Sequence, residues 1–183
     1  MDYTYDEALF RATGYEGESK RARTLRHEEL LIVAAREGWV DVLEALIEDG
    51  ADIRFAHDVL LDVAAKQGRA YVVRNLLALG AKATSDSSRA LRLASQKGHI
   101  QVVRVLLANG ADARALDSDA LAQAALNGHE TIVRELLEAG ADPLAFDGRP
   151  LRAAILKGHK GVGMILVDHL TATQPQRSTK TCY

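Results

Sequence analysis

Three histidines recur at a fixed spacing that would suit metal ligands. His99, His129 and His159 lie thirty residues apart, and each directly follows a glycine. Ligands around one zinc ion must each lie about 2.0 to 2.1 Å from it. Equivalent positions of stacked helices are roughly 8 to 10 Å apart, so adjacent layers cannot share an ion without unusual reach. We therefore predict that each imidazole makes a local hydrogen bond at a turn between helices, with no metal bound.

Two carboxylates, Asp58 and Asp62, are the other candidate for chemistry. Carboxyl groups four residues apart share one face of a helix and could act as general acid and base. No nucleophile, glycine-rich loop or metal-ligand pattern lies near them, and the phosphate-loop, GxSxG, HExxH and dinucleotide motifs are absent from the sequence. The sequence thus predicts no enzyme and no cofactor. Asp58 is instead predicted to cap a helix, and Asp62 to lie on a helix surface.

Composition limits the kind of protein further. The chain has 183 residues, a formal net charge of −2 and one cysteine, Cys182. Nucleic-acid binders usually carry a clear basic excess, so the charge gives no reason to expect a polyanionic partner. A single cysteine permits no intrachain disulfide, which favours a reducing cytoplasm. No signal-like start and no stretch of about 18 apolar residues is present, so we expect no membrane association.

Glycine reveals the element that must position all these residues, a thirty-residue repeat. One glycine column contains Gly38, Gly68, Gly98, Gly128 and Gly158, and a second contains Gly50, Gly80, Gly110 and Gly140. Between the columns, Val42, Leu43, Leu46 and Ile47 and their equivalents follow the spacing of one helical face. Before the first column, a leucine and an alanine recur in a second helix, and Asp58, Ser88, Ser118 and Gly148 stand at its expected N-cap.

Each unit is therefore turn, helix, turn, helix, and stacked units would share a continuous core. We predict an all-α solenoid with five repeats at about 29–58, 59–88, 89–118, 119–148 and 149–170. Residues 1–28 lack the period and are predicted to form an N-terminal capping helix, in "YDEALFRAT", and a charged segment. Residues 171–183 are polar and are predicted to form a disordered tail.

The Leu-x-x-Ala-x-x-x-Gly-His, Val-Val, Leu-Leu and Gly-Ala-Asp elements resemble the ankyrin repeat over residues 29 to about 170. Two features depart from that family's pattern. Its Thr-Pro-Leu-His opening survives only as Pro150-Leu151, and the period is 30 rather than the usual 33. The missing residues fall in the loop, so the projecting hairpin of the family is reduced to a tight connection. The short period is similar to that of ankyrin proteins from large viruses and some bacteria.

The resemblance implies a non-catalytic scaffold that captures a protein through its concave inner helices and loop tips. Stand-alone size and the short repeat suggest a viral, phage or bacterial protein that occludes or inhibits its target. Positions where the repeat constrains least are the candidate contacts. The apolar candidates, which could form one concave patch or instead tuck under the loops, are Leu116, Leu126, Leu144, Phe146 and Leu156.

Charge supplies a second set of candidates. Residues 29–58 carry eight acidic and two basic side chains, whereas residues 149–183 carry six basic and one acidic. A groove that shifts from acidic to basic would orient a partner of complementary charge; its basic candidates are Arg89, Arg92, Lys97, Arg114, Arg149, Arg152 and Lys157. The alternative is a basic groove that binds nucleic acid or a small molecule, although we do not expect nucleic acid. Opposite charge at the two ends also allows head-to-tail self-association.

Overall fold

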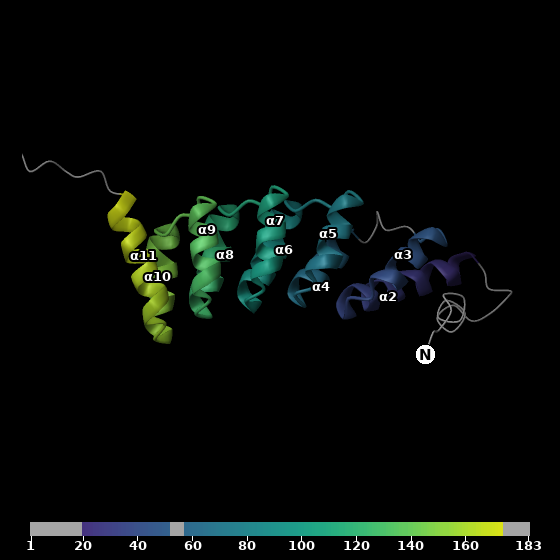
Figure 1. Ribbon diagram of the computed structural model, residues 1–183, viewed down its shortest axis with the longest axis horizontal. Helices are drawn as coiled ribbons and strands as arrows, with labels where there is room; N and C mark the ends of the chain where they lie inside the picture. Colours follow the sequence, from purple (N-terminus) through teal and green to yellow (C-terminus); the bar gives the residue numbers. More distant parts are fainter. Residues whose placement is uncertain (1–19, 52–56, 174–183) are drawn as a thin grey trace, which may run out of the picture.

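The computed structural model describes residues 20–51 and 57–173, which form α-helices and contain no strand (Figure 1). Inner and outer helices alternate along this part of the chain. The inner helices are α2 (Lys20–Glu37), α4 (His57–Lys66), α6 (Ser85–Lys97), α8 (Ala115–Leu126) and α10 (Ala145–Lys157). The outer helices are α3 (Val40–Glu48), α5 (Ala70–Ala78), α7 (Ile100–Ala108), α9 (Glu130–Glu138) and α11 (Lys160–Thr173).

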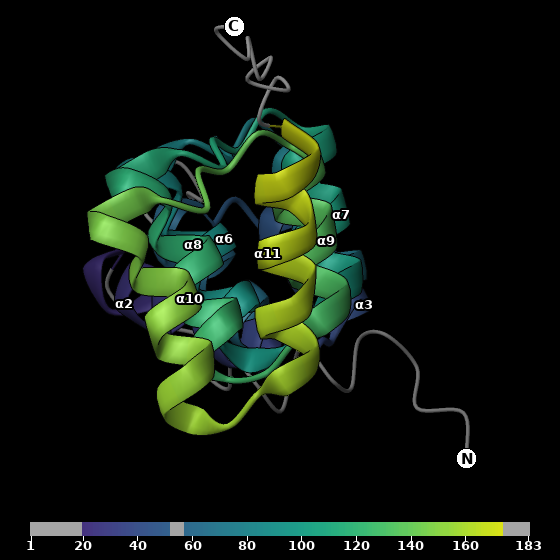
Figure 2. The ribbon, with the colours of Figure 1, turned by 90° about the vertical axis from the view of Figure 1, so that its left-hand side faces the viewer.

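The helices stack in two layers, as Figure 2 shows along the stack, with α6, α8 and α10 in one layer and α7, α9 and α11 in the other. Each inner helix contacts the next inner helix, and from α5 onwards each outer helix contacts the next outer helix. The predicted all-α solenoid of stacked helix pairs is confirmed. No helix in the two described ranges is both long and apolar enough to cross a bilayer.

The core follows the columns of the repeat. Leu31, Leu61, Leu91 and Leu121 are buried, and so are Ala34, Ala64, Ala94, Ala124 and Ala154. Because an alanine side chain ends at Cβ, neighbouring helices approach closely at these positions and leave no void. The partly exposed Leu151 breaks the leucine column, since no further helix pair lies beyond the last unit in the described residues.

The loops between the units differ from what the sequence predicted. Residues 86–88, 116–118 and 146–148 each form one turn of left-handed backbone, with φ between 45° and 75°. Ser88 and Ser118 therefore do not have the extended backbone of an N-cap. Their buried hydroxyls accept instead the backbone N–H groups of Asp112 and Asp142, both at 2.9 Å, in the loop that follows. The serines thus tie one loop to the next rather than capping their own helices.

The ends of the repeat region can be compared with their predicted boundaries. Helix α2, the first inner helix, begins at Lys20 within the predicted charged segment and continues without a break through the first predicted repeat to Glu37. The predicted capping helix at "YDEALFRAT" lies outside the described residues. Helix α11 extends to Thr173, three residues into the predicted tail, and the rest of that tail also lies outside the described residues.

Candidate functional site

Each recurring histidine joins one unit to the unit before it. The Nε2 atoms of His99, His129 and His159 lie 3.0, 3.2 and 3.1 Å from the backbone oxygens of Lys66, Gln96 and Leu126. Arg69 fills the same position earlier in the chain, and its Nε donates to the Arg36 oxygen at 3.0 Å. These carbonyls stand near the C-terminal ends of inner helices, where the helix offers no backbone partner. The side chains thus provide donors between stacked units.

Glycine makes room for this contact. Gly98 has φ +83°, and a Cβ added there would lie 2.7 Å from Cε1 of His129. Gly68 and Gly128 meet His99 and His159 in the same way. Within the described residues, no group of three or more histidine, cysteine, aspartate or glutamate side chains could hold a metal ion. The spacing that suggested a metal site is therefore accounted for by inter-unit hydrogen bonds.

The five apolar candidates fall into two groups instead of one patch. Leu116 and Phe146 stand in the left-handed turns that begin α8 and α10, and Leu144 directly precedes α10. They are 50, 50 and 58% exposed, and we call these three residues the loop cluster. Leu126 and Leu156 stand at the opposite ends of α8 and α10, where Leu126 is partly buried and Leu156 is exposed. The idea that these side chains tuck under the loops does not hold for the exposed ones.

The loop cluster includes two bulky residues in an unfavourable backbone conformation. Leu116 has φ 48° and Phe146 has φ 47°. Left-handed backbone costs roughly 1–2 kcal/mol for a residue with a side chain, and bulky residues avoid it. The equivalent position one unit earlier holds Asp86, a residue type that tolerates this conformation better. These two side chains are therefore strained in their backbone and half exposed, so they gain little from burial in the fold.

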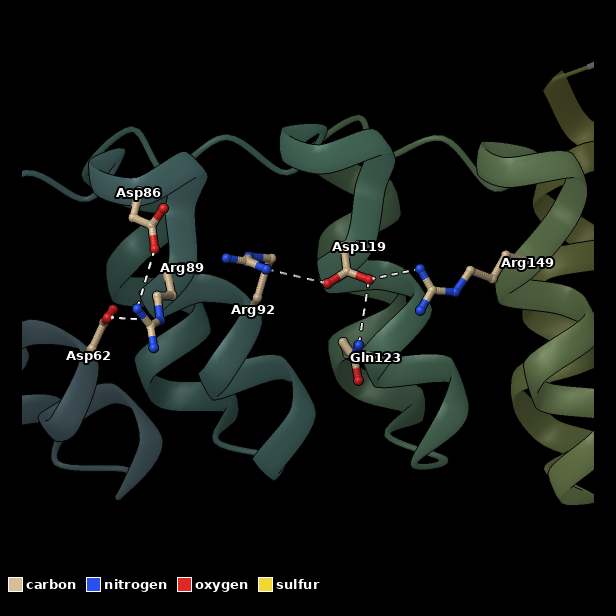
Figure 3. A network of polar contacts seen from close by, with 7 residues as sticks. All are labelled: Asp62, Asp86, Arg89, Arg92, Asp119, Gln123 and Arg149. Atoms are coloured by element: carbon tan, nitrogen blue, oxygen red, sulfur yellow. Dashed lines mark hydrogen bonds and ion pairs between the residues drawn. The ribbon is translucent and has the colours of Figure 1, made fainter.

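The exposed face of the inner helices carries two neighbouring sets of ion pairs, shown in Figure 3. One set is Asp62, Arg89 and Asp86, the other is Arg92, Asp119 and Arg149, and we call the six residues together the charge ladder. Arg89 lies 3.2 Å from Asp62 on α4 and 3.4 Å from Asp86 in its own loop. Asp119 on α8 lies between two arginines, 3.6 Å from Arg92 on α6 and 3.1 Å from Arg149 on α10. Charge therefore alternates from one inner helix to the next.

The predicted shift from acidic to basic along the groove stays a prediction, but the ion pairs engage many of its basic residues. Three of the seven basic candidates, Arg89, Arg92 and Arg149, are held in the charge ladder. Arg114 donates to the Gly140 oxygen at 2.7 Å, and Arg152 reaches the Phe146 oxygen at 3.4 Å. Lys97 and Lys157 are exposed at the C-terminal ends of α6 and α10. Most of the expected basic groove is thus neutralised or engaged within the chain.

Sequence reasoning missed Asp86 and Asp119 of the charge ladder, and also Gln123, which contacts Asp119. The Gln123 amide donates to Asp119 at 3.5 Å, and both residues line a depression of about 190 Å³ between α6 and α8. A signal was available, since Asp119 lies thirty residues after Arg89 and thirty before Arg149. In a stack of thirty-residue units, that spacing brings the three side chains to the same height on neighbouring helices.

The two carboxylates considered for catalysis have different surroundings. Asp58 is exposed in the first turn of α4. Burial raises the pKa of Asp62 from 3.8 to about 6, and the Arg89 guanidinium partly opposes this rise. A carboxyl group that titrates near neutrality is also found in active sites. Here the burial of Asp62, with a smaller contribution from the nearby carboxylates of Asp86 and Asp58, accounts for the raised pKa in structural terms.

Comparison with known sequences agrees with this architecture. A family model described as ankyrin repeats, in three copies, matches residues 61–147 and 91–179, which together cover more than half of the chain. No curated protein sequence matches. The matched region contains the histidine contacts, the loop cluster and the whole charge ladder.

Proposed function

The chain belongs to the ankyrin-repeat family, and on this premise we propose that it is a non-catalytic scaffold that binds a partner protein through its inner-helix face and the adjoining loops. Ankyrin repeats are generally protein–protein interaction modules. The family supplies the class of function but no particular partner. The surface used by this chain has to be argued from its own exposed side chains.

The observation that carries the proposal is the loop cluster. Leu116, Leu144 and Phe146 project from successive loops, exposed by half or more, and two of them occupy strained backbone. Aromatic and aliphatic side chains that lose water on binding contribute most of the energy of many interfaces. Arg149 lies over the Phe146 ring, 5.6 Å from its centroid, and so helps to orient that ring before a partner arrives.

The charge ladder supports the same face in a different way. Its side chains are held in place by one another, so little side-chain entropy is lost when a partner covers them. Exposed basic groups on the same helices include Lys97, Arg152 and Lys157. We propose that the partner presents apolar side chains to the loop cluster and carboxylates to these basic groups. Complementary charge of this kind increases the association rate and fixes the orientation of the complex.

Nucleic acid is less well supported as the ligand of this face. Phosphate binding needs arginines or lysines that are free to replace counterions. In the charge ladder, Arg92 and Arg149 share Asp119, and Arg89 faces two carboxylates. A polyanion would have to displace these acids or be repelled by them. A protein surface with both apolar and charged groups fits the face better.

We further propose that binding itself is the activity, so that the scaffold acts by covering a functional surface of its target in the cytoplasm. The stacked, closely packed units form a rigid body suited to occlusion. The single cysteine is compatible with a reducing compartment. An inhibitory role predicts that the bound partner loses an activity which it regains on release.

The experiment is affinity capture with three baits: the wild type, Leu144→Glu with Phe146→Glu, and Tyr71→Glu with Leu79→Glu. The last bait is matched in chemistry but changes exposed residues of α5 and its C-terminus, on the outer side. The proposal expects the partner to be retained by the wild type and the outer-side variant and lost by the loop variant. Equal retention by all three baits contradicts it.

A further inference from the structure

The open end of the stack carries an apolar surface that the proposed partner-binding face does not include. Leu151, Ile155, Met164 and Val167 line a hollow of about 610 Å³ between α10 and α11. Ile155 is 67% exposed and Met164 is 66% exposed. We call the surface formed by these four residues the end face. It lies at the far end of the stack from α2, where Figure 1 shows α10 and α11 as the last helix pair.

The same positions in the preceding unit show what this kind of surface does. Ala125, thirty residues before Ile155, is completely buried, and Leu137, the equivalent of Val167, is 5% exposed. Both are covered by the next helix pair. The last unit places a large side chain at 155 and replaces Arg134 with Met164 at the equivalent outer-helix position. These changes add apolar surface that no helix pair of the described residues covers, and exposed apolar surface of this kind often marks an interface.

The charges beside the end face indicate which body. Lys160, Met164 and Asp168 are four residues apart on α11, so they lie along one face of the helix, with the methionine midway between opposite charges. If a second α11 lies antiparallel across this face, each Lys160 meets the Asp168 of the other helix and the two Met164 side chains meet at the centre. Both Lys160 and Asp168 are exposed and are in no ion pair within the described chain.

We propose that the end face binds a second copy of this chain, through antiparallel α11 helices related by a two-fold axis beside Met164. This arrangement is self-complementary and closes at two copies, as two-fold interfaces do. Gly163, which also lines the hollow, has no side chain to keep the two helices apart. The loop cluster and the charge ladder stay uncovered, so the dimer offers two partner-binding faces and gains avidity for a multivalent target.

Sedimentation velocity of the full-length protein over the micromolar range tests this proposal. We expect the mass to rise from one copy to two and to stop there. Met164→Glu places two carboxylates together at the centre of the interface and should raise the dimer Kd by at least about tenfold. Tyr71→Glu, at an exposed site on α5, should leave that Kd unchanged. All the substituted side chains are exposed, and circular dichroism confirms that each variant keeps its helices.

A charge exchange tests the antiparallel pairing itself. Lys160→Asp alone and Asp168→Lys alone each place like charges opposite one another and should weaken the dimer. An equimolar mixture of the two variants should form heterodimers, because both pairs become opposite in sign. The variant carrying both changes should also dimerise. A wild type that stays monomeric, a mixture that fails to recover, or a mass that grows beyond two copies overturns the proposal.

Discussion

Asp119 and Arg149, thirty residues apart in the sequence, lie 3.1 Å apart on neighbouring inner helices, and the same carboxylate lies 3.6 Å from Arg92 on the other side. One acid thus joins three successive units. Its side chain is only 16% exposed, so solvent screens it less than an ordinary surface charge. The ion pairs of Asp119 therefore join the same neighbouring units that pack against each other through the apolar core.

Asp119→Asn should lower the free energy of unfolding by about 1 kcal/mol, because two arginines would then face each other without a carboxylate between them. Urea unfolding measures this change. Asp117→Asn is the matched control, since Asp117 is exposed in the adjoining loop and asparagine tolerates its left-handed backbone. Equal effects of the two substitutions would argue against the bridge.

Gly98→Ala should destabilise the protein more than Gly110→Ala. Both glycines have nearly the same φ, +83° and +84°. Each substitution therefore has the same cost of about 1 kcal/mol for placing alanine in left-handed backbone. Only at Gly98 would the new Cβ overlap the His129 ring, whereas nothing lies within 4 Å of the one at Gly110. Thermal melting of the two variants compares them directly. A lower midpoint for Gly110→Ala would contradict the packing of His129 on Gly98.

Leu116→Asn tests whether the loop cluster is kept for contact. Asparagine relieves the left-handed strain, which stabilises the fold, and removes the buried half of the leucine side chain, which destabilises it. The two effects oppose each other. The free energy of unfolding should therefore stay within about 0.5 kcal/mol or rise. Chemical denaturation gives this value, and partner capture by the same variant should weaken. A loss of stability above about 1 kcal/mol would show that Leu116 serves the fold.

Asp62→Asn should stabilise the protein at neutral pH and much less in acid. The pKa of Asp62 is about 6 in the folded chain against an ordinary value of 3.8, so the folded state binds its proton more tightly. Ionisation of this group therefore destabilises the wild type as pH rises through 6, and the cost is absent below about pH 4. Urea unfolding at several pH values should show the two proteins converging in acid. A constant difference across the range would contradict the raised pKa.

The repeat itself could be predicted because the glycine columns, the apolar spacing and the recurring leucine and alanine all have the same period. Gly98 and His129 recur at the period of the stack, and their packing follows from that period. The left-handed turns could not be predicted, since Leu116 and Phe146 are residue types that normally avoid such backbone. The N-cap role expected of Ser88 was wrong because Ser88 lies in one of these left-handed turns. Its hydroxyl accepts a hydrogen bond from the next loop instead.

The candidate site was predicted only in part. A list of basic residues suggested a groove, but the pairing of Arg92 and Arg149 depends on which side chains meet across units. Helix length separates Leu126 from Leu116, because α8 rises about 1.5 Å per residue between them. The end face is exposed because no further helix pair of the described residues packs against Ile155. The period of the sequence alone does not show which unit lies at the end of the stack. Residue types and spacing therefore predicted which positions repeat. Contacts with adjacent units determined which of the side chains at those positions stay exposed.

The most direct measurement is a calorimetric titration of the captured partner into the wild type, the Leu144→Glu and Phe146→Glu variant, and the Tyr71→Glu and Leu79→Glu variant. We expect the loop variant to bind at least about 100-fold more weakly, as for loss of two interface anchors, and the outer-side variant to bind like the wild type. Unchanged affinity of the loop variant, with its helices intact, would contradict binding through the inner-helix face and its loops.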